Sequence, residues 1–590
     1  MQEPDPKAVR AHIEAGDLIL AYDLLSPAIA DGVADPQLRY LYVLALARMG
    51  ATESAMAQYQ QLGVGDIETT DTQALGARLL KDQAFASQPD QRPELLSKAA
   101  DAYMRIHENS GDAYPAVNAS SLYFLADETE RAAKIARDVT GSTTSQAPAS
   151  YYDHATLAEA HVVLGDFEAA RRALIHATDC PDASIAARAG TGRQLLRILD
   201  HCGVEAPVKD ALLDCLKTGT SLHFCGRMFA EDAEIEEELG NRIEAFLAAN
   251  EVAAAFGSLA CGADILIAER LMDRGIPVYI VLASPEKSFL QTSVAIGGDG
   301  WAARFNACVE KARDVVSIGD PFYANDPIAF ALASNVAMGM AVSFAGQNGC
   351  DLHQLAITEG EETVGAAGTN ADMKRWMESG RPTTTLAAKG IRRPKPADNT
   401  FSDNRGDGAF NRRAVSLLFA DFAGFTSISD QFLPNLLTDA LNAMAELFED
   451  YADDVVIKNT WGDACFVAFK SNAFAAKAAL ELPRRLNMGE FGKLGLRLRV
   501  SLHHGIVLEL EDPVLGRTNL FGREVSRAAR IEPITPPGCV YASQQFVSIA
   551  MNDPHSRIDC QYVGKVPLAK KYGNERLYLI TGCSLDDDHK

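Results

Sequence analysis

The chain has 590 residues, a length that accommodates roughly three or four domains. Hydrophobic residues make up 47% and charged residues 23%, an ordinary balance for a globular protein with a large core. Its 79 Asp and Glu residues outnumber its 55 Lys and Arg residues and give a formal net charge of −24. This acidity argues against general electrostatic binding of nucleic acids or acidic membranes, so we expect neither as a partner.

The sequence favours a cytoplasmic protein. The start, Met1-Gln-Glu-Pro-Asp-Pro6, lacks the basic residues and apolar core of a signal peptide. The longest apolar stretch, 327–346, contains Ser334, Asn335 and Ser343 and has no basic flank, so we expect a buried helix there and no membrane span. The 11 cysteines form no Cys-x-x-Cys pair and no zinc-ligand spacing, and reduced thiols are the simplest interpretation.

Residues 1–214 show helical patterns throughout. Ala-rich segments with apolar residues at three- and four-residue spacing are separated by Gly, Asp or Pro. In Glu14-Ala-Gly-Asp17 and in Leu164-Gly-Asp166, a glycine ends one helix and an aspartate is placed to cap the next. This turn resembles that of tetratricopeptide repeats, and residues 112–127 resemble the repeat region upstream of apoptosis-signal-regulating kinases. The resemblance implies a surface for a protein partner; a helical packing domain without a groove is the alternative.

Residues 215–385 alternate predicted strands and helices. Strand-like segments begin at Ser221, Ala253, Ile276, Asp314 and Leu352, and helical patterns follow them. Such alternation predicts a parallel sheet covered by helices on both faces, with glycine loops at the carboxyl ends of the strands, where such sheets bind ligands.

The order of these elements resembles the Rossmann-like SLOG superfamily of nucleotide-related sensor and processing domains. The resemblance implies that Gly226, Gly257, Gly262 and Asp264 line a sensor pocket for a nucleotide-derived ligand. Glycines that serve close packing are the alternative. Residues 386–411 are then poor in aliphatic side chains and rich in Pro, Gly, Asn and Asp, which predicts a mobile linker before a last domain at 412–583.

Two aspartates in the last domain stand at the edges of strand-like apolar runs. Asp421 follows Leu417-Leu-Phe-Ala420, and Asp463 precedes Ala464-Cys-Phe-Val-Ala-Phe469. Carboxylates on adjacent strands can hold two divalent cations against a polyphosphate, and N–H groups of the turn 422–426 at a helix start can bind phosphate oxygens. The pattern indicates nucleoside triphosphate chemistry, although an aspartate at a strand end is often just a cap or turn former.

Four segments of this domain resemble the class III nucleotidyl cyclases, the adenylate and guanylate cyclase family. They are Asp421-Phe-Ala-Gly-Phe-Thr426, Lys458-Asn-Thr-Trp-Gly-Asp463, residues 521–532 and residues 564–573. The resemblance covers about 412–582 and implies a ferredoxin-like α/β domain with an antiparallel sheet. The predicted fold class is therefore multidomain, with a helical repeat domain, a Rossmann-like parallel sheet and a cyclase-like α/β domain.

The resemblance also assigns roles to residues. Asp421, Asp463 and the Phe422 carbonyl would hold two Mg²⁺ or Mn²⁺ ions per site. Arg530 matches the arginine that stabilises the transition state, with a salt-bridged helix arginine as the alternative. The residues assigned to substrate binding are Lys458, Asn519, Phe422, Ala423, Gly424, Phe425, Thr426, Lys570 and Lys571, where the last two are alternatives for one phosphate-binding lysine.

Two positions depart from the family pattern. Asn519 stands where adenine-specific members carry Asp or Thr, while Lys458 argues against guanine, for which Glu is usual. Asn offers both a donor and an acceptor to a base. Ser526 replaces the asparagine that orients the ribose, and its shorter hydroxyl either acts through water or makes turnover slow.

These features predict a sensor-regulated cyclase that converts a nucleoside triphosphate, with ATP favoured, to the cyclic monophosphate and pyrophosphate. Because the family builds each site from two cyclase domains, one domain per chain implies a homodimer. One alternative, kept open by Asn519, is a pyrimidine nucleotide cyclase as in bacterial anti-phage signalling. Another, favoured by Ser526, is a degenerate cyclase domain that serves as a nucleotide-binding or dimerisation module.

Overall fold

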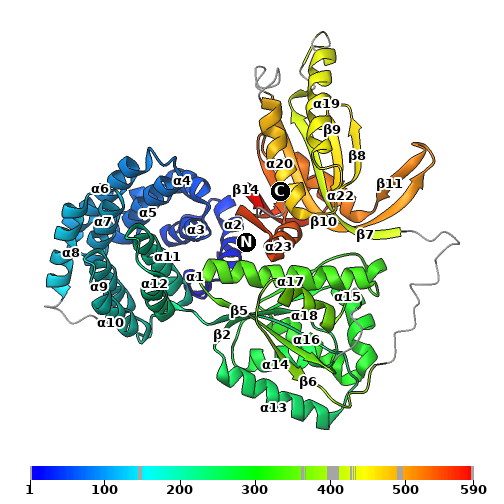
Figure 1. Ribbon diagram of the computed structural model, residues 1–590, viewed down its shortest axis with the longest axis horizontal. Coiled ribbons are helices and arrows are strands. Elements are labelled where there is room, and N and C mark those ends of the chain that lie inside the picture. The colour runs from blue at the N-terminus through cyan, green and yellow to red at the C-terminus, as the bar shows by residue number, and fades with distance from the viewer. Residues whose placement is uncertain are drawn as a thin grey trace. The chain divides into compact units, whose positions relative to one another are not determined.

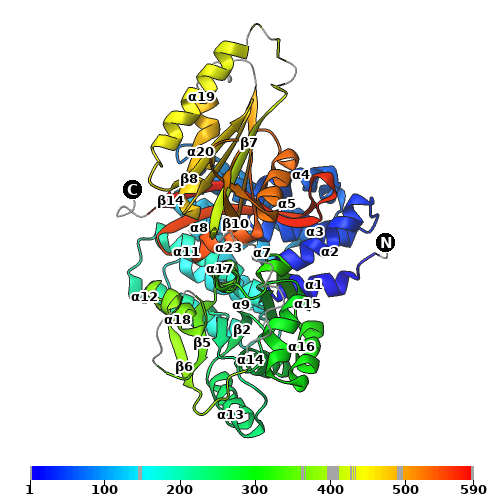
Figure 2. The ribbon, with the colours of Figure 1, turned by 90° about the vertical axis from the view of Figure 1, so that its right-hand side faces the viewer.

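The computed structural model (Figures 1 and 2) describes residues 3–143, 149–360, 365, 367–394, 411–425, 428–429, 431, 433–487 and 496–585. The chain divides into two compact units. The first comprises Met1–Thr218 with Gly346–Cys350, and the second comprises Gly219–Ala345 with Asp351–Lys590.

The first unit is built from helices. Their bounds are α1 Pro6–Glu14, α2 Leu18–Ala30, α3 Pro36–Arg48, α4 Thr52–Gln61, α5 Thr70–Ala86, α6 Arg92–Ser110, α7 Ala113–Leu125, α8 Thr129–Thr143, α9 Tyr151–Val163, α10 Phe167–Thr178, α11 Ile185–His201 and α12 Ala206–Leu213. Neighbouring helices in the chain pack against each other, as in α5 with α6, α6 with α7 and α9 with α10. This confirms the predicted helical repeat domain.

The two predicted helix junctions differ in their capping. At Gly165 the backbone is left-handed (φ +77°), and the Asp166 carboxylate accepts from the Ala169 N–H at 2.9 Å, which satisfies a free donor of α10. Gly16 is also left-handed (φ +81°), but the Asp17 side chain makes no capping hydrogen bond to α2 and instead lies 3.6 Å from His12. Asp17 is thus the N-cap residue of α2 as predicted, but its carboxylate lies beside His12 of α1 and makes no capping hydrogen bond.

The second unit begins with a parallel six-stranded sheet. Its strands are β1 Thr220–Gly226, β2 Val252–Gly257, β3 Val278–Leu282, β4 Asp314–Ser317, β5 Asp351–Thr358 and β6 Thr383–Ala387, in the order β4-β3-β2-β1-β5-β6. The connecting helices include α13 Ala233–Ala249, α14 Ala263–Asp273, α15 Glu286–Phe289, α16 Asp299–Lys311, α17 Pro327–Asn348 and α18 Thr369–Glu378. Every neighbouring strand pair is parallel, which confirms the predicted parallel sheet.

The linker predicted from residue 386 starts too early. Leu386 and Ala387 pair with Ile357 and Thr358 as the end of β6, and the Ala388 N–H donates to the Thr358 carbonyl at 2.8 Å. Strand β6 is an edge strand and is rich in threonine, so its sequence lacks the apolar run by which the inner strands were predicted. The rest of the linker prediction lies largely at 395–410, outside the described residues.

Helix α17 contains the longest apolar stretch. Among the described residues, this helix alone is long and apolar enough to cross a membrane by length and composition, and 56% of its apolar stretch is buried inside the protein. A core helix of a globular protein can have the same length and composition. Ser221 on β1 donates a hydrogen bond to the Ala341 carbonyl of α17 at 2.8 Å, so the helix packs on the parallel sheet (Figure 1).

The second sheet holds eight strands. They are β7 Asn411–Ala423, β8 Val455–Trp461, β9 Ala464–Phe469, β10 Arg497–Asp512, β11 Arg517–Phe521, β12 Val540–Ser543, β13 Ser556–Pro567 and β14 Asn574–Leu585, in the order β13-β14-β12-β10-β7-β9-β8, with β11 paired to β10. The helices are α19 Leu433–Glu449, α20 Asn472–Asn487, α22 Arg523–Ile531 and α23 Gln544–Asn552. The sheet is antiparallel as predicted, except that β10 and β12 run parallel. Figure 2 shows α19 and α20 side by side along it.

Candidate active site

Two carboxylates meet at the end of the central strand β7. Strand β9 pairs with β7 so that Ala420 faces Cys465, and the tight β8–β9 turn at Gly462 (φ +63°) places Asp463 beside Asp421. The two aspartates share a side-chain hydrogen bond, and burial followed by the charge of Asp421 raises the pKa of Asp463 to about 6. The predicted pair of metal ligands is therefore brought together, across 42 residues of sequence, by the hairpin register.

An arginine and a glutamate complete this cluster. Arg499 on β10 donates from Nη2 to Asp421 Oδ2 at 2.8 Å, and its Nε lies 2.9 Å from Glu532 Oε1 in an ion pair that is not aligned as a hydrogen bond. Burial raises the pKa of Glu532 to about 7, and the charges of Asp421 and Asp463 add to that rise while Arg499 opposes it. The sequence interpretation missed Arg499 and Glu532.

The pair of aspartates fits a hard divalent cation. Two carboxylates that converge in a half-buried place repel each other, and a divalent cation bound between them would offset that repulsion. Within the described residues, no group of three or more His, Cys, Asp or Glu side chains is arranged to hold a metal. A cation at this place would need further oxygens from a backbone carbonyl such as that of Phe422 and from a phosphate, which is the usual way in which Mg²⁺ is held.

The predicted phosphate-binding turn follows β7. Phe422 is buried and Ala423 ends the strand, Gly424 is left-handed (φ +81°), and the Phe422 and Phe425 rings lie 6.4 Å apart. Thr426 lies outside the described residues. The sequence had suggested that the N–H groups of this turn lie at the start of a helix. Helix α19 begins only at Leu433, so the N–H groups of residues 422–425 are not part of its first turn.

The two residues predicted to read the base lie on strands that touch. Arg517 on β11 donates to Asn459 on β8, next to Lys458. Lys458 is half exposed and lies 3.6 Å from Glu449, whereas Asn519 on β11 donates to Asp512 Oδ2 at 3.2 Å. Neither partner is a buried anchor, so both side chains can exchange these contacts for a base.

Helix α22 carries two arginines, Arg527 and Arg530, that differ in their contacts. Arg527 pairs with Glu575 at 2.5 Å and with Glu524 at 3.3 Å. The salt-bridged role that was the alternative for Arg530 is therefore filled by Arg527. In the part of the chain that the structure describes, the partly exposed Arg530 has no hydrogen-bond or ion-pair partner. Ser526 lies one turn before Arg530 on the same face and donates to the Gly522 carbonyl at 3.4 Å.

The predicted phosphate lysines sit in a strained turn. Lys570 and Lys571, in the turn Ala569–Lys571, are both exposed and both left-handed (φ +58°). That conformation costs a non-glycine residue on the order of 1–3 kcal/mol, and such strain is typical of ligand-binding segments. The hydroxyl of Tyr572 donates to the Arg523 carbonyl at 3.1 Å, which ties this turn to the start of α22.

The predicted sensor pocket contains two of its four residues. Gly226 and Asp264 line a cavity of about 320 Å³ at the carboxyl end of β1, together with Asp372. Gly257 and Gly262 do not line it: a Cβ on Gly257 would meet Phe224 at 2.6 Å, and Gly262 is left-handed (φ +95°) against Phe229. These two are packing glycines, the alternative stated for them above. Burial raises the pKa of Asp264 to about 7 and of Asp372 to about 6.

The antiparallel sheet, with Asp421 near the end of β7, Asp463 in the adjoining β8–β9 turn and Arg530 on α22, agrees with the predicted class III nucleotidyl cyclase catalytic domain. Family comparison agrees. Residues 409–582 match the adenylate and guanylate cyclase catalytic domain, and residues 17–123 match the tetratricopeptide repeats-sensor domain. The chain therefore carries a catalytic domain of the adenylate and guanylate cyclase family and a repeat domain of the sensor type.

Individual relatives match less than a third of this chain. Guanylyl cyclase C of Homo sapiens is 31% identical over 188 residues, which are 28% of this chain and 17% of that protein. Guanylate cyclase D of Mus musculus is 31% identical over 183 residues, 28% of this chain and 16% of that protein. The matches thus span about a sixth of the length of these relatives. Among solved structures, the adenylyl cyclase CyaB from P. aeruginosa is 21% identical, with 30% of this chain and 99% of that chain covered and a TM-score of 0.27.

Proposed function

We propose that the protein is a nucleotidyl cyclase that converts a nucleoside triphosphate, with ATP favoured, to the 3′,5′-cyclic monophosphate and pyrophosphate. The observation that carries this proposal is the meeting of Asp421 and Asp463 at the end of β7, in a domain of the cyclase family. The 3′-oxygen forms a bond to the α-phosphorus, the bond from that phosphorus to the pyrophosphate oxygen breaks, and the hydroxyl proton leaves to solvent.

Each group of residues has a task in this reaction. Asp421, Asp463 and the Phe422 carbonyl would hold two Mg²⁺ or Mn²⁺ ions, which when bound lower the pKa of the 3′-hydroxyl and offset phosphate charge. Arg530, free of other partners in the described residues, donates to the α-phosphate as charge grows there. Lys570 or Lys571 holds the terminal phosphates, and Ser526 replaces the usual ribose-orienting amide.

The base is assigned from the chain's own residues. The curated relatives that match are named guanylyl cyclases, but Lys458 and Asn519 do not repeat the guanine pattern, and for this reason we favour ATP. A pyrimidine nucleotide is the second candidate, because the Asn519 amide offers both a donor and an acceptor. Incubation of the full chain with each of the four ribonucleoside triphosphates and Mn²⁺ or Mg²⁺, with products read by mass spectrometry, tests both. A protein that forms no cyclic product from any of them would be the degenerate module.

Asn519 offers a sharper test of base recognition. We expect Asn519→Asp to raise the preference for ATP over the other three nucleotides, because a carboxylate accepts more strongly from the adenine amino group. The measurement is the ratio of kcat/KM values across the four nucleotides, with Asn472→Asp, a buried site outside the proposed pocket, as a check on folding. Unchanged ratios would remove Asn519 from the base-reading role.

The other domains are proposed to regulate the cyclase. We assign a nucleotide-derived ligand to the cavity beside Gly226 and Asp264, because it lies where the order of the parallel strands reverses between β1 and β5. The helical repeats are assigned a protein partner. The cyclase domain is assigned to homodimers with two shared sites, and the whole protein to the cytoplasm.

Shared sites make activity depend on how two subunits align. We expect a chain that begins at Asn411 to differ from the full chain in basal activity by roughly tenfold, or about 1.4 kcal/mol, and to dimerise more weakly. Rates and sedimentation velocity measured on both proteins check this. Equal rates together with equal dimer affinity would show that the first two-thirds of the chain has no part in subunit geometry.

A further inference from the structure

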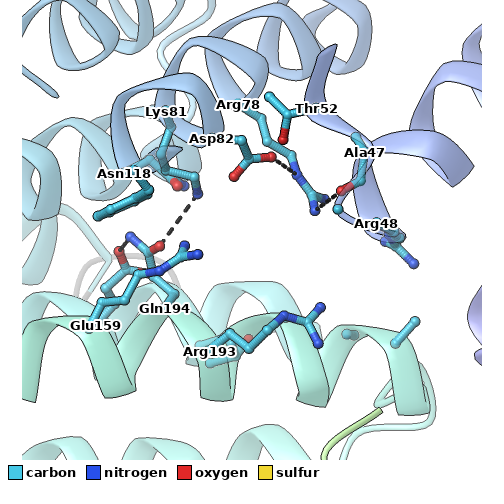
Figure 3. Close-up of a pocket in the computed structure, with 18 of the residues that line it drawn as sticks. Ala47, Arg48, Thr52, Arg78, Lys81, Asp82, Asn118, Glu159, Arg193 and Gln194 are labelled. Carbon is cyan, nitrogen blue, oxygen red and sulfur yellow. Dashed lines mark hydrogen bonds and ion pairs between the residues drawn. The ribbon is translucent and has the colours of Figure 1, made fainter. Parts of the chain in front are cut away.

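The helical unit encloses a cavity of about 550 Å³ that the proposed cyclase reaction does not use. Its walls come from α3, α5, α7, α9 and α11, the inner helices of successive pairs (Figure 3). The volume falls within the range of about 300–1,000 Å³ that is typical of small-molecule sites. This cavity is separate from the proposed sensor pocket, which belongs to the other unit.

Positive side chains dominate the cavity wall. The charged residues that line it are Arg48, Arg78, Lys81, Arg193, Arg197, Asp82 and Glu159, so that cations exceed carboxylates by three. Figure 3 shows Arg78 and Lys81 on one side and Arg193 on the other, pointing into the space between the helices. Such an excess is unexpected in a chain whose net charge is −24.

The two carboxylates are already engaged by other groups. Asp82 Oδ2 accepts from Arg78 Nε at 3.4 Å. Glu159 Oε1 accepts from Ser121 at 2.5 Å and from Gln194 Nε2 at 3.0 Å. The negative charge in the cavity therefore leaves the remaining cations, Arg48, Lys81, Arg193 and Arg197, without an ion pair among the described residues.

One of these cations has an unsatisfied donor, and a second donates only to a neutral acceptor. Nη1 of Arg48 is buried and has no hydrogen-bond partner among the described residues, although the Tyr152 side chain lies beside the guanidinium. Lys81 Nζ reaches a neutral acceptor, Gln194 Oε1, at 3.4 Å. A buried donor without an acceptor destabilises the fold, and more so when it is charged, so a bound anion would remove a cost that the fold carries here.

The electrostatic effects agree with this geometry. Burial lowers the pKa of Lys81 to about 8, with Asp82 opposing and Arg78 adding. Burial lowers the pKa of Arg193 to about 10, and repulsion from Arg78, Arg197 and Arg48 adds to that. Cations on a solvated helix face would not be affected in this way, because water screens them.

We propose that this cavity binds a small phosphorylated ligand with at least two negative charges and a planar ring, of the nucleoside diphosphate class. Arg48 and Arg193 carry planar guanidinium groups, which suit phosphate oxygens. Nη1 of Arg193 donates to the carbonyl of Gln347, another residue of the cavity wall, at 2.6 Å, so its other donors are the ones that would reach a ligand. Tyr114 and Tyr152, whose side chains are 43% and 44% exposed, line the same cavity and offer ring faces for stacking a base. A ligand of this class satisfies the free donors and neutralises the excess charge at once.

The test is calorimetric titration of the full chain with ADP, inorganic pyrophosphate and 3′,5′-cyclic AMP. A chelator is present throughout, so that the cyclase site, which is proposed to need metal, does not contribute. Arg48→Gln and Lys81→Gln are compared with Arg172→Gln, which removes the same charge from the exposed outer helix α10. We expect ADP to bind the parent chain, and each cavity variant to lose at least tenfold in affinity while the control stays within twofold.

The same titrations identify the ligand class. Cyclic AMP, with one negative charge, is expected to bind at least tenfold more weakly than ADP, and pyrophosphate, which has no ring, is also expected to bind more weakly. Arg48→Lys should recover part of the affinity lost in Arg48→Gln, and the thermal midpoint of Arg48→Gln should not fall, because an unpartnered charge has been removed.

Several results would overturn the proposal. If Arg48→Gln and Lys81→Gln bind ADP as the parent does, the nucleotide binds elsewhere. Pyrophosphate binding as tight as ADP binding would reject the planar ring, and displacement of ADP by an acidic hexapeptide at equal concentration would point to a protein partner. None of these results bears on cyclic product formation, so this proposal and the cyclase assignment fail independently.

Discussion

Asp463→Asn is expected to reduce cyclic nucleotide formation by at least a thousandfold in Mg²⁺ while leaving the fold intact. The amide keeps the size of the side chain but cannot contribute a second negative oxygen to a cation shared with Asp421, and each good charged contact of this kind is worth several kcal/mol in the transition state. The measurement is kcat at saturating nucleotide in Mg²⁺ and in Mn²⁺. Turnover near that of the parent in Mg²⁺ would refute the assignment of Asp463 as a metal ligand.

The same variant has a second, independent readout in chelator. Burial and Asp421 raise the pKa of Asp463 to about 6, above its value in the unfolded chain, so ionised Asp463 destabilises the metal-free fold. This cost is absent below about pH 4, where the carboxyl is protonated in both states, grows as the pH rises from there, and is complete above about pH 6. Asp463→Asn should therefore change the thermal midpoint little near pH 4 and raise it at pH 8. Asp439→Asn, at an exposed site on α19, serves as the control for both readouts.

The meeting of Asp421 and Asp463 could be predicted because each aspartate is placed by a short segment of sequence. Asp421 and Asp463 each stand at the edge of a strand whose apolar residues are contiguous, and a two-residue hairpin turn fixes the second aspartate against the neighbouring strand. Arg499 and Glu532 could not be placed in the same way. The two-residue spacing of Arg497 and Arg499 does indicate that they share one face of a strand. No short-range feature of the sequence, however, indicates that Arg499 pairs with Asp421 on β7.

Glycines show the opposite difficulty. Gly226, Gly257 and Gly262 all follow predicted strands, and the sequence pattern is the same for a loop that approaches a ligand and for one that approaches a side chain. Tertiary packing decides between them: a Cβ would meet Phe224 at Gly257, Phe229 at Gly262 and Ala263 at Gly226, and of the three only Gly226 also lines the cavity. The phenylalanines belong to the same segment of sequence, yet their directions follow from the sheet register and cannot be read from spacing.

The cationic cavity could not be predicted from the sequence, for a related reason. Arg78 and Lys81, three residues apart on α5, are typical of a solvated helix face when taken alone. Their meaning changes because α3 and α11 bring three further arginines to the same space, and that convergence depends on how successive helix pairs stack. Long-range stacking in a repeat domain therefore creates charge clusters that no window of the sequence contains.

Arg530→Gln is expected to lower kcat by about 10²- to 10³-fold, the loss seen when one preorganised donor to transition-state charge is removed. Arg530 has no partner among the described residues, so its replacement should change the free energy of unfolding by no more than about 0.5 kcal/mol. The KM for the nucleotide should change less than kcat, because the contact strengthens as charge develops on the α-phosphate.

Arg527→Gln, three residues earlier on α22, provides the contrast that identifies this role. Arg527 pairs with Glu575 at 2.5 Å and with the buried Glu524 at 3.3 Å. Its loss leaves Glu575 without this ion pair, while Glu524 keeps only His503, whose Nε2 lies 2.6 Å away. That should destabilise the fold by about 3 kcal/mol or more, measured as a lower thermal midpoint. If Arg530→Gln instead lost stability and kept its kcat, Arg530 would be a structural residue like Arg527. Arg557→Gln, at a side chain 84% exposed on β13, should change neither quantity and sets the baseline for both measurements.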